Sequence, residues 1–373
     1  MVVERITLMP ASALPALVVG TGFGCRIQVP ALRAAGFEVV GLVGTDAKRT
    51  QERAELNSVP KGFADLDEAI ARTGAVAVTI ATPPSTHKAL TLTAIARGCH
   101  VICEKPFAMS AAEGQAMLSA AKAAGIVHLI GHEFRWSPER ALIARLVADG
   151  AVGKPKFATF TSFSPYIAGP NVDMPSWWFD MEWGGGWLGA AGSHLIDWIR
   201  TILGEIESLS AALSVLAARE AEADDTYAFR FRGATGVDGI VQQSAATWGP
   251  PLDVVRVAGP QGTVWIEGRD VWLADREGSR QVALPEELRL PPLPPVSTDP
   301  RQKSPKWQML VGVELPGYVR LCEAFRDLIN GRKPSAAVAI PTFADGLASM
   351  QVLDAIRASD ASGGALVKIK PSA

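Results

Sequence analysis

The chain has 373 residues, 48% of them hydrophobic and 20% charged, which is enough for two domains with sizeable cores. Its 36 lysines and arginines nearly balance its 38 aspartates and glutamates, and the resulting net charge of −2 argues against a nucleic-acid-binding protein. No apolar run reaches the roughly 18 residues of a membrane span, and the N-terminal apolar stretch is typical of a first strand and not of a signal peptide. Four cysteines offer no disulfide framework, so we expect a cytoplasmic protein.

The first third of the chain alternates short apolar segments with helical ones. Strands are predicted at 14–19, 38–43, 76–82, 100–103 and 126–131. Helices are predicted after the first strand as far as Ala35, and then at 46–56, 87–97 and 110–124. Ser110 and Glu113 have capping-box spacing at the start of the last of these helices. This alternation indicates a parallel sheet with helices on both faces.

The rest of the chain has a different pattern. Helices are predicted at 141–148, 190–203, 319–329 and 342–358, and strands at 157–163, 227–231, 254–257, 263–267 and 271–274. These strands indicate one large, mostly antiparallel sheet with a covered and an open face. Seven prolines between Pro285 and Pro305 indicate a stiff, extended loop. We therefore predict an α/β protein with a dinucleotide-binding Rossmann domain at 1–133 and a substrate and oligomerisation domain at 134–373.

A glycine-rich turn follows the first predicted strand and leads into a helix. Residues without a Cβ allow a tight turn and a close approach of pyrophosphate, and the helix N-terminus supplies amide donors and a positive dipole end. Cys25 stands where a third glycine is usual and is small enough for close packing. In this context the motif predicts a dinucleotide site, with a purely structural turn as the alternative. The residues expected to bind the cofactor here are Gly20, Thr21, Gly22, Phe23, Gly24 and Cys25.

The residues after the second predicted strand decide between NAD and NADP. An acid roughly 20 residues after the glycines would bind the ribose of NAD, but Gly44 occupies that position. Thr45, Lys48 and Arg49 follow and could bind a 2′-phosphate, so the sequence favours NADP. In the alternative, Asp46 binds the ribose of NAD and the two basic residues are ordinary helix surface.

Three further segments carry a resemblance to a known family. They are Ala81-Thr-Pro-Pro-Ser-Thr-His87, Cys103-Glu-Lys-Pro106 and Gly184-Gly-Gly-Trp-Leu-Gly-Ala-Ala-Gly-Ser-His-Leu-Ile-Asp197. In this order they resemble the glucose–fructose oxidoreductase, inositol dehydrogenase and rhizopine-catabolism (Gfo/Idh/MocA) family. The resemblance implies a Rossmann domain, then an α/β domain with an open sheet, and homodimers or homotetramers formed through that sheet. It also makes the last helix, 342–358, a candidate to pack back on the Rossmann domain.

The resemblance implies that the loop of Thr82, Pro83 and His87 lies beneath the nicotinamide, with Glu104 and Lys105 beside it. The chemistry of Lys105 agrees, because an alcohol that loses hydride must also lose its hydroxyl proton. A lysine whose pKa is lowered by burial and a neighbouring cation can take that proton. Glu104 could tether the lysine or the nicotinamide amide. In the alternative, Lys105 simply pairs with Glu104 at a solvated strand end.

His194 is the second candidate catalytic residue. At the start of a helix and after three glycines, it could hydrogen-bond the substrate hydroxyl and relay its proton, although a structural histidine is the alternative. The family usually carries an acid four residues earlier, and here that position is Ala190. The relay is then shorter, or uses Asp197 or Asp180, or the chemistry is weakened.

Tryptophan is unusually common: there are ten against three tyrosines, and five lie between Trp177 and Trp198. This stretch runs directly into the glycine–histidine signature, so we expect it to end near the cofactor. Aromatic faces stack on sugar or cyclitol rings, and carboxylates bind hydroxyls. We expect one or two of Trp178, Trp183 and Trp187 to line the pocket and the rest to pack as core. The candidate substrate residues are Glu133, Trp178, Asp180, Trp183 and Asp197.

No metal site is predicted, because Cys99 and Cys103 are poorly spaced for one, and a Gly-x-Ser-x-Gly hydrolase elbow is lacking. The favoured hypothesis is an NADP(H)-preferring oxidoreductase that interconverts a secondary alcohol and a ketone on a sugar, cyclitol or related small cyclic substrate. Lys105 would act as acid/base and His194 would orient or relay. Two alternatives stay open. One is an enzyme of the same family that cleaves glycosides by redox-assisted elimination, and the other is a non-catalytic NAD(P)-binding sensor.

Overall fold

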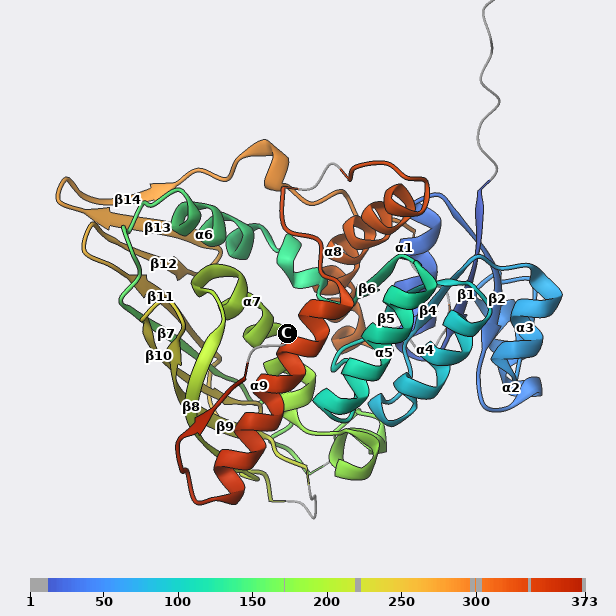
Figure 1. Ribbon diagram of the computed structural model, residues 1–373, viewed down its shortest axis with the longest axis horizontal. Coiled ribbons are helices and arrows are strands. Elements are labelled where there is room, and N and C mark those ends of the chain that lie inside the picture. Colours follow the sequence, from blue (N-terminus) through green and yellow to red (C-terminus); the bar gives the residue numbers. More distant parts are fainter. Residues whose placement is uncertain are drawn as a thin grey trace, which may run out of the picture.

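The computed structural model describes residues 13–170, 172–218, 223–295, 299, 304–334 and 337–370. Within these residues the chain forms a six-stranded and a nine-stranded sheet. In Figure 1 the six-stranded sheet lies at the right and the nine-stranded sheet at the left, with helices between them. This arrangement brings the first sheet and the helices of the second half of the chain into contact.

The six-stranded sheet is wholly parallel and has the order β3–β2–β1–β4–β5–β6. Every residue of β4 is buried, as expected for a strand covered by helices on both faces. Folds of this order bind ligands outside the carboxyl ends of the strands, where the strand order reverses between β1 and β4. The strands are β1 (Leu14–Val19), β2 (Phe37–Val43), β3 (Gly62–Phe63), β4 (Ala77–Ile80), β5 (His100–Cys103) and β6 (His128–Ile130). The predicted parallel Rossmann sheet is confirmed.

The helices of this half cover both faces of the sheet, α1 on one and α3 to α5 on the other. The sequence did not predict β3 or α3, although Asp65 caps α3 at its start and Gly74 ends it in the left-handed conformation. The helices are η1 (Gly24–Gln28), α1 (Val29–Ala34), α2 (Ala47–Leu56), α3 (Leu66–Thr73), η2 (Pro84–Thr86), α4 (His87–Ala96), α5 (Ala111–Ala124) and η3 (Glu133–Trp136).

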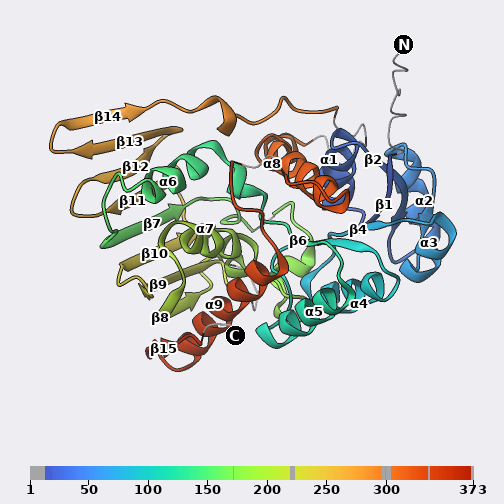
Figure 2. The same ribbon diagram turned by 45° about the horizontal axis from the view of Figure 1, so that its top comes forward.

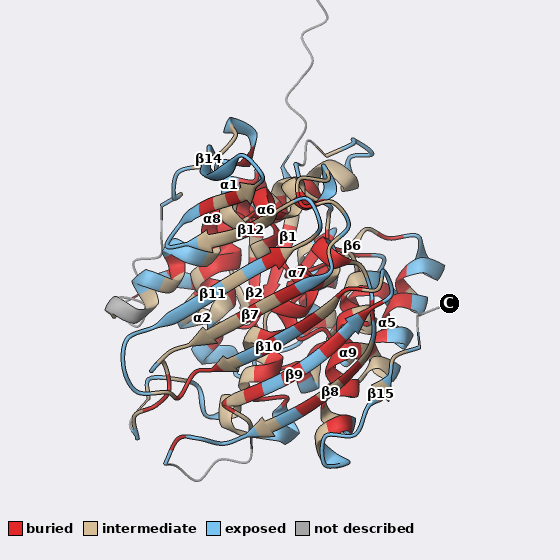
Figure 3. Cartoon of the chain, turned by 90° about the vertical axis from the view of Figure 1, so that its left-hand side faces the viewer, coloured by how far each residue is buried: buried red, intermediate tan, exposed pale blue. Residues whose placement is uncertain are grey.

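The nine-stranded sheet has the order β14–β13–β12–β11–β7–β10–β9–β8–β15. Only the β7–β10 pair is parallel among the neighbours described, so the predicted mostly antiparallel sheet is confirmed. Figure 3 looks onto its outer face, where buried and exposed residues alternate along the strands. The strands are β7 (Phe157–Phe163), β8 (Ile206–Ser214), β9 (Thr226–Gly233), β10 (Asp238–Ser244), β11 (Leu252–Ala258), β12 (Thr263–Glu267), β13 (Asp270–Asp275), β14 (Gly278–Val282) and β15 (Val367–Lys368).

Two interior strands of this sheet, β8 and β10, were not predicted from the sequence. Strand β8 mixes small and polar residues, and β10 contains Gly239. A Cβ at Gly239 would lie 2.2 Å from Cζ of Phe231, so the glycine makes room for that ring. Packing within the sheet therefore outweighs the weak strand propensity of these segments.

Two long helices return from the second half of the chain to the first. Helix α8 lies beside α1, and α9 lies against α5 and β8 (Figure 2). The expectation that a helix starts at residue 319 is wrong, because α8 already begins at Pro305 and continues through Pro316. The extended loop predicted for 285–305 lies partly outside the described residues. The helices of this half are α6 (Pro138–Ala148), η4 (Ser176–Phe179), η5 (Met181–Trp183), η6 (Leu188–Gly192), α7 (Ser193–Leu203), η7 (Glu286–Leu288), α8 (Pro305–Ile329) and α9 (Phe343–Ala361).

Candidate active site

The glycine turn lies at the point where β1 and β4 diverge. Gly20 has φ +108°, its N–H donates to the carbonyl of Val43 at 2.8 Å, and a Cβ there would lie 2.2 Å from the carbonyl oxygen of Ala81. A Cβ at Gly24 would lie 2.7 Å from Val18 Cγ1, whereas one at Gly22 would have no neighbour within 4 Å. The turn is thus packed against the sheet and open at Gly22. Such a cradle, followed by a helix, fits a dinucleotide pyrophosphate.

The segment after β2 presents a hydroxyl and a guanidinium side by side. Arg49 Nη2 donates to Thr45 Oγ1 at 3.1 Å, and both residues are exposed. The Asp46 carboxylate accepts the backbone N–H of Arg49 at 2.7 Å and so caps α2. Gly44 is tightly enclosed, since a Cβ there would lie 2.4 Å from Thr50 Oγ1. One oxygen of Asp46 is thus engaged by its own helix, and Asp46 is exposed at this strand end together with Thr45, Lys48 and Arg49.

The loop after β4 is fixed from behind by His87. Its ring is fully buried, with Nδ1 3.0 Å from the carbonyl oxygen of Pro106 and Nε2 2.9 Å from that of Thr82. Burial lowers the pKa of His87. Because both ring nitrogens face backbone, His87 holds the Thr82–Pro83 loop against the segment at Pro106 and does not present its ring to a ligand, contrary to the expectation that it contacts the cofactor.

Lys105 follows β5 and reaches the second half of the chain. A cis peptide bond joins it to Pro106, and its Nζ donates to the carbonyl oxygen of Ala190 at 3.4 Å. Glu104 lies behind it, 5% exposed: Gln28 Nε2 donates to its Oε1 at 3.3 Å and to the hydroxyl of Tyr318 at 2.8 Å. Burial raises the pKa of Glu104, whereas the charge of Lys105 lowers it. The backbone N–H of Lys105 donates to Oε2 of this buried carboxyl group at 3.3 Å, which fixes the backbone at the strand end.

Glu133 and His194 face one another beside Lys105. Glu133 opens η3 after β6, His194 lies in the first turn of α7, and Oε1 of the acid is 3.7 Å from Nε2 of the imidazole. Burial raises the pKa of Glu133 well above its usual range, and the charge of Glu104 adds to this, while Lys105 opposes it. Burial and the positive charge of Lys105 lower the pKa of His194. The structure thus brings together three of the residues that the sequence singled out.

Asp197 lies one helical turn further on and is fully engaged. It accepts hydrogen bonds from Arg135 Nε at 2.8 Å and from Nη2 at 2.5 Å, and Nη2 also donates to Asp345 at 2.8 Å. Arg200 Nη1 lies 3.9 Å from both carboxylates. Asp197 is 2% exposed, so it is not available to a substrate, contrary to expectation. Its ion pairs join η3, α7 and α9.

Three polar residues near Lys105 were missed in the sequence. Burial raises the pKa of Glu314 in α8 to about 7, while the charges of Lys105 and Arg26 lower it. The Arg26 guanidinium lies 4.0 Å from the ring centre of Trp307. Burial and the negative charge of Glu314 raise the pKa of Tyr166 to about 12. Arg26 could have been found from its place directly after the glycine turn. Glu314 could not, because nothing local connects residue 314 to residue 105.

The tryptophans form a chain of ring contacts that ends near these groups. Centroids are 5.7 Å apart for Trp177 and Trp178, 6.3 Å for Trp178 and Trp187, and 5.8 Å for Trp187 and Tyr166. Trp183 lies outside this chain and is 47% exposed. In the same turn Asp180 accepts the N–H of Glu182 at 2.8 Å. The roles of Trp178, Trp183 and Asp180 toward a substrate stay predictions.

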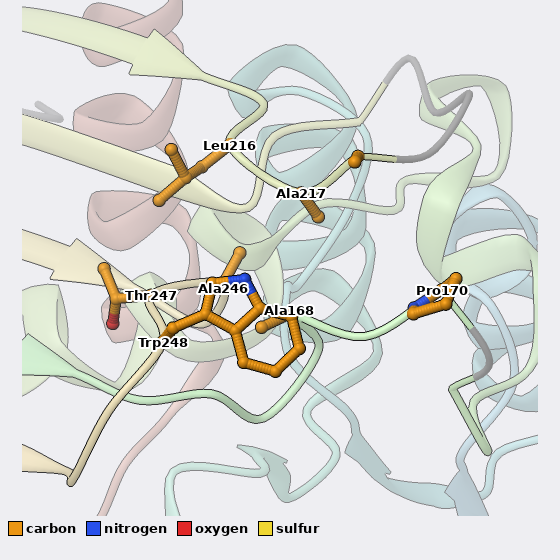
Figure 4. A pocket seen from close by; sticks show the side chains of 8 residues that line it. Ala168, Pro170, Leu216, Ala217, Ala246, Thr247 and Trp248 are labelled. Atoms are coloured by element: carbon orange, nitrogen blue, oxygen red, sulfur yellow. The ribbon is translucent and has the colours of Figure 1, made fainter.

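A surface hollow of about 470 Å³ lies apart from this cluster (Figure 4). Trp248, 78% exposed, lies across from Leu216 and Ala217, with Ala168 beside its ring. The lining shares no residue with the groups around Lys105. The part of the chain that the structure describes contains no group of three or more histidine, cysteine or acidic residues able to hold a metal ion, and no helix there is long and apolar enough to cross a membrane.

Comparison with known proteins adds a second line of evidence. Residues 14–132 match the model of an oxidoreductase family with an NAD-binding Rossmann fold, and residues 141–265 match the Gfo/Idh/MocA C-terminal domain. An uncharacterized oxidoreductase of Synechocystis sp. is 32% identical over 203 residues, 54% of each chain. A D-apiose dehydrogenase of Paraburkholderia graminis is 27% identical over 271 residues, 70% of each chain. The chain thus matches only about half the length of the first of these relatives.

A solved levoglucosan dehydrogenase, in complex with NADH and levoglucosan, has the same fold. It superposes with a TM-score of 0.80 at 24% identity and covers 96% of this chain and 100% of its own. The glycine turn and the Glu-Lys-Pro segment lie within the first matched range, and the glycine–histidine segment lies within the second. The chain belongs to the Gfo/Idh/MocA family of NAD(P)-dependent oxidoreductases.

Proposed function

We propose that this protein is an NADP(H)-preferring oxidoreductase that interconverts a secondary alcohol and a ketone on a sugar, cyclitol or related small cyclic substrate. The observation that carries the proposal is the convergence of Lys105, Glu133 and His194 outside the carboxyl ends of β5 and β6, beside the glycine turn of β1. The similarity to a D-apiose dehydrogenase and a levoglucosan dehydrogenase supports a carbohydrate substrate. The predicted location in the cytoplasm belongs to the same proposal.

The cofactor would be held by the glycine turn, with Gly22 leaving room for its pyrophosphate. The loop of Thr82 and Pro83 would support the nicotinamide from below, and His87 would fix that loop. When bound, the nicotinamide accepts hydride from a substrate carbon or returns it. Lys105 takes the hydroxyl proton in the oxidation and gives it back in the reduction, and His194 orients the hydroxyl and relays the proton.

The preference for NADP rests on the exposed pair of Thr45 and Arg49, because a hydroxyl and a guanidinium suit a 2′-phosphate and no acid stands at Gly44. Arg49→Ala should weaken NADPH binding about tenfold, or about 1.4 kcal/mol, and leave NADH binding unchanged. Thr45→Asp should reverse the preference by repelling the phosphate. Gly44→Asp is a poorer test, since its Cβ would meet Thr50. Arg276→Ala, on an exposed turn of the other sheet, is the control.

The activity is tested with the purified protein, NADP⁺ or NAD⁺, and a panel of cyclic sugars and cyclitols that includes levoglucosan and apiose. Net formation of reduced nicotinamide, lost in Lys105→Ala, is the expected result. Cleavage of a glycoside without net reduction would favour the eliminating enzyme. Cofactor binding without turnover of any member of the panel, unchanged in Lys105→Ala, would favour the sensor.

We also propose that the protein forms homodimers or homotetramers through the open face of the nine-stranded sheet. That face carries the exposed side chains of Phe157, Ile240 and Leu252, and the rings of Trp265 and Trp272 stack on one another with centroids 6.1 Å apart. Ile240→Glu should lower the mass measured by light scattering to that of a smaller assembly. An unchanged mass would mean that another surface, or none, joins the subunits.

A further inference from the structure

One buried carboxyl group in the site has no hydrogen-bond partner on either oxygen. Glu133 is 1% exposed, and neither Oε1 nor Oε2 finds a donor among the described residues. Buried polar groups nearly always have partners, because burial removes their hydration. Glu133 is therefore maintained at a cost to stability, and such groups concentrate where chemistry is done.

The imidazole of His194 is the nearest partner of this carboxyl group. Nε2 lies 3.7 Å from Glu133 Oε1, and His194 is itself 5% exposed. The imidazole ring of His194 packs against the rings of Phe134 and His132, whose centroids are 4.4 and 5.6 Å away. These contacts restrict the position of the imidazole that faces the Glu133 carboxylate.

Among the described residues, the other acids near His194 are engaged or face other groups. Glu314 also has an unpartnered carboxylate oxygen, but its charged neighbours are Lys105 and Arg26. Asp197 is held by Arg135, and Asp180 accepts a hydrogen bond from its own turn. Ala190 offers Lys105 only its backbone carbonyl. Glu104 lies behind the lysine, bonded to Gln28. The positions of these groups leave Glu133 as the carboxylate that His194 faces.

We propose that Glu133 is the positioning carboxylate of His194, the residue at which the proton relay from Lys105 ends. The inference rests on the proposed function. In the oxidation, the substrate carbon would lose a hydride to the nicotinamide, and its hydroxyl would lose a proton to the amine of Lys105. The lysine passes a proton to His194, and the Glu133 carboxylate stabilises the imidazolium that forms. The proton leaves to water when the product departs, and the reduction runs the same steps in reverse.

Two contacts fix the position of Glu133 relative to His194. Gly317 in α8 packs on the backbone of η3, where a Cβ would lie 2.7 Å from the Glu133 carbonyl oxygen. The bidentate pair of Arg135 and Asp197 ties η3 to α7 within a turn of both groups. The short distance between carboxylate and imidazole thus follows from packing that does not involve either side chain.

Charged groups face the pair from every element around it. Glu104 and Lys105 come from the end of β5, Glu314 from α8, His132 from the start of η3 and Arg140 from α6. The lysine and the arginine oppose a charge on His194, whereas the carboxylates oppose a charge on Glu133. These positive neighbours disfavour an imidazolium at His194, so a facing carboxylate is needed to stabilise it, and removal of the Glu133 carboxyl should make the imidazole harder still to protonate.

The first test follows the imidazole by NMR of histidine-labelled protein without cofactor or substrate, with the His194 signal assigned from His194→Asn. Glu133→Gln, which keeps the shape of the side chain, should lower the midpoint of the His194 titration by about one unit. Glu314→Gln is the matched control, because it removes a neighbouring carboxyl that faces Lys105 and Arg26. It should move the midpoint by less than half as much. An unchanged midpoint in Glu133→Gln, or an equal shift in the control, overturns the proposal.

The second test is kinetic and separates a relay from a structural role. Glu133→Gln should lower kcat at least tenfold with KM within about twofold, and should shift the pH profile of kcat. Glu133→Asp should restore the shape of the wild-type profile at a reduced rate. A Glu133→Gln protein with wild-type kcat and profile overturns the proposal. If the wild type turns over no substrate, the proposed function fails, and the titration of His194 still decides the pairing.

Discussion

Two clusters of buried charge lie side by side on η3 and α7, and they differ in one respect. In the cluster of Arg135, Asp197 and Asp345, the guanidinium makes three hydrogen bonds to carboxylates. In the cluster of Glu133, His194 and Lys105, the acid has no hydrogen-bond partner among the described residues. In the first cluster, the hydrogen bonds and ion pairs offset the desolvation cost of burying the charges and hold the elements rigidly together. In the second cluster, no hydrogen bond from the described part of the chain offsets the desolvation cost of the acid. The paired cluster therefore ties η3 to α7 and so holds Glu133 and His194 of the unpaired cluster in place.

The largest expected effect lies in the unpaired cluster. Lys105→Ala removes the group proposed to take the hydroxyl proton, so kcat should fall by about 10²- to 10⁴-fold. Binding of NADPH, measured by fluorescence titration, should change by no more than a few-fold, because the glycine turn and Thr45 are untouched. Turnover that survives the substitution would show that the chemistry lies elsewhere.

The second effect lies in the paired cluster and concerns stability. Asp197→Asn should leave the buried Arg135 guanidinium without its bidentate partner and lower the free energy of unfolding by about 3–5 kcal/mol. Urea denaturation followed by circular dichroism measures this directly. Asp238→Asn, which removes a partner of exposed Arg230 and Arg232, should cost less than about 1 kcal/mol and serves as the control. Equal losses in both variants would erase the distinction between the clusters.

The third effect is a pH dependence at the edge of the unpaired cluster. The pKa of Glu314 is about 7 in the folded protein, against an ordinary value of 4.5, so the folded state holds a proton that the unfolded chain has already released. Stability contributed by this group is therefore present below about pH 4.5 and is lost as the pH rises through about 7. Over this pH range, the free energy of unfolding of the Glu314→Gln variant should fall by about 1–3 kcal/mol less than that of the wild type. A decline identical to that of the wild type would show that Glu314 is ionised throughout.

His132 should act in the opposite direction. Burial lowers its pKa to about 4, so the unfolded chain binds a proton below about 6.5 that the folded protein refuses. Stability from this group is lost as the pH falls from about 6.5 to 4. Between about pH 6.5 and 4, the free energy of unfolding of the His132→Asn variant should fall less than that of the wild type. Urea denaturation at each pH measures this difference.

The smallest expected effect is the change in stability of the Glu133→Gln variant. Because the carboxyl group has no partner, its replacement by an isosteric amide should leave the free energy of unfolding at neutral pH unchanged or raise it by about 1–2 kcal/mol. This is the reverse of the effect expected for Asp197→Asn in the paired cluster. A clear loss of stability in Glu133→Gln would mean that the carboxyl group is bonded after all, and the contrast between the clusters would fail.

The first sheet was predictable because each of its main strands is a short apolar run followed by a helix. Strands β8 and β10 were not, because their small and polar residues carry no clear period and depend on neighbours such as Phe231. Helix α8 was predicted too short, at 319–329, whereas it begins at Pro305, contains Pro316 and packs on α1.

Sequence motifs pointed to Lys105 and His194, and the structure brings both to one place with Glu133. The proximity of Glu314 and the engagement of Asp197 could not be foreseen. They depend on contacts between elements that are distant in the chain, such as Arg135 with Asp345. A motif predicts which residue types serve a reaction, whereas the pairing of each charge depends on how the helices of the second half pack.

The return of α8 and α9 to the first sheet has a consequence for how the chain folds. Leu315, Tyr318 and Phe325 of α8 belong to the same buried cluster as α1 and β2, and the Phe325 ring stacks on that of Phe37 at 5.8 Å. During synthesis, the face of the Rossmann sheet that α1 covers stays partly exposed until residues beyond 305 have left the ribosome. Contacts of such long range make folding slow and expose apolar surface on the way. A fragment that ends before α8 should therefore aggregate rather than bind a nucleotide, which makes assembly of the cofactor site one of the last events in folding.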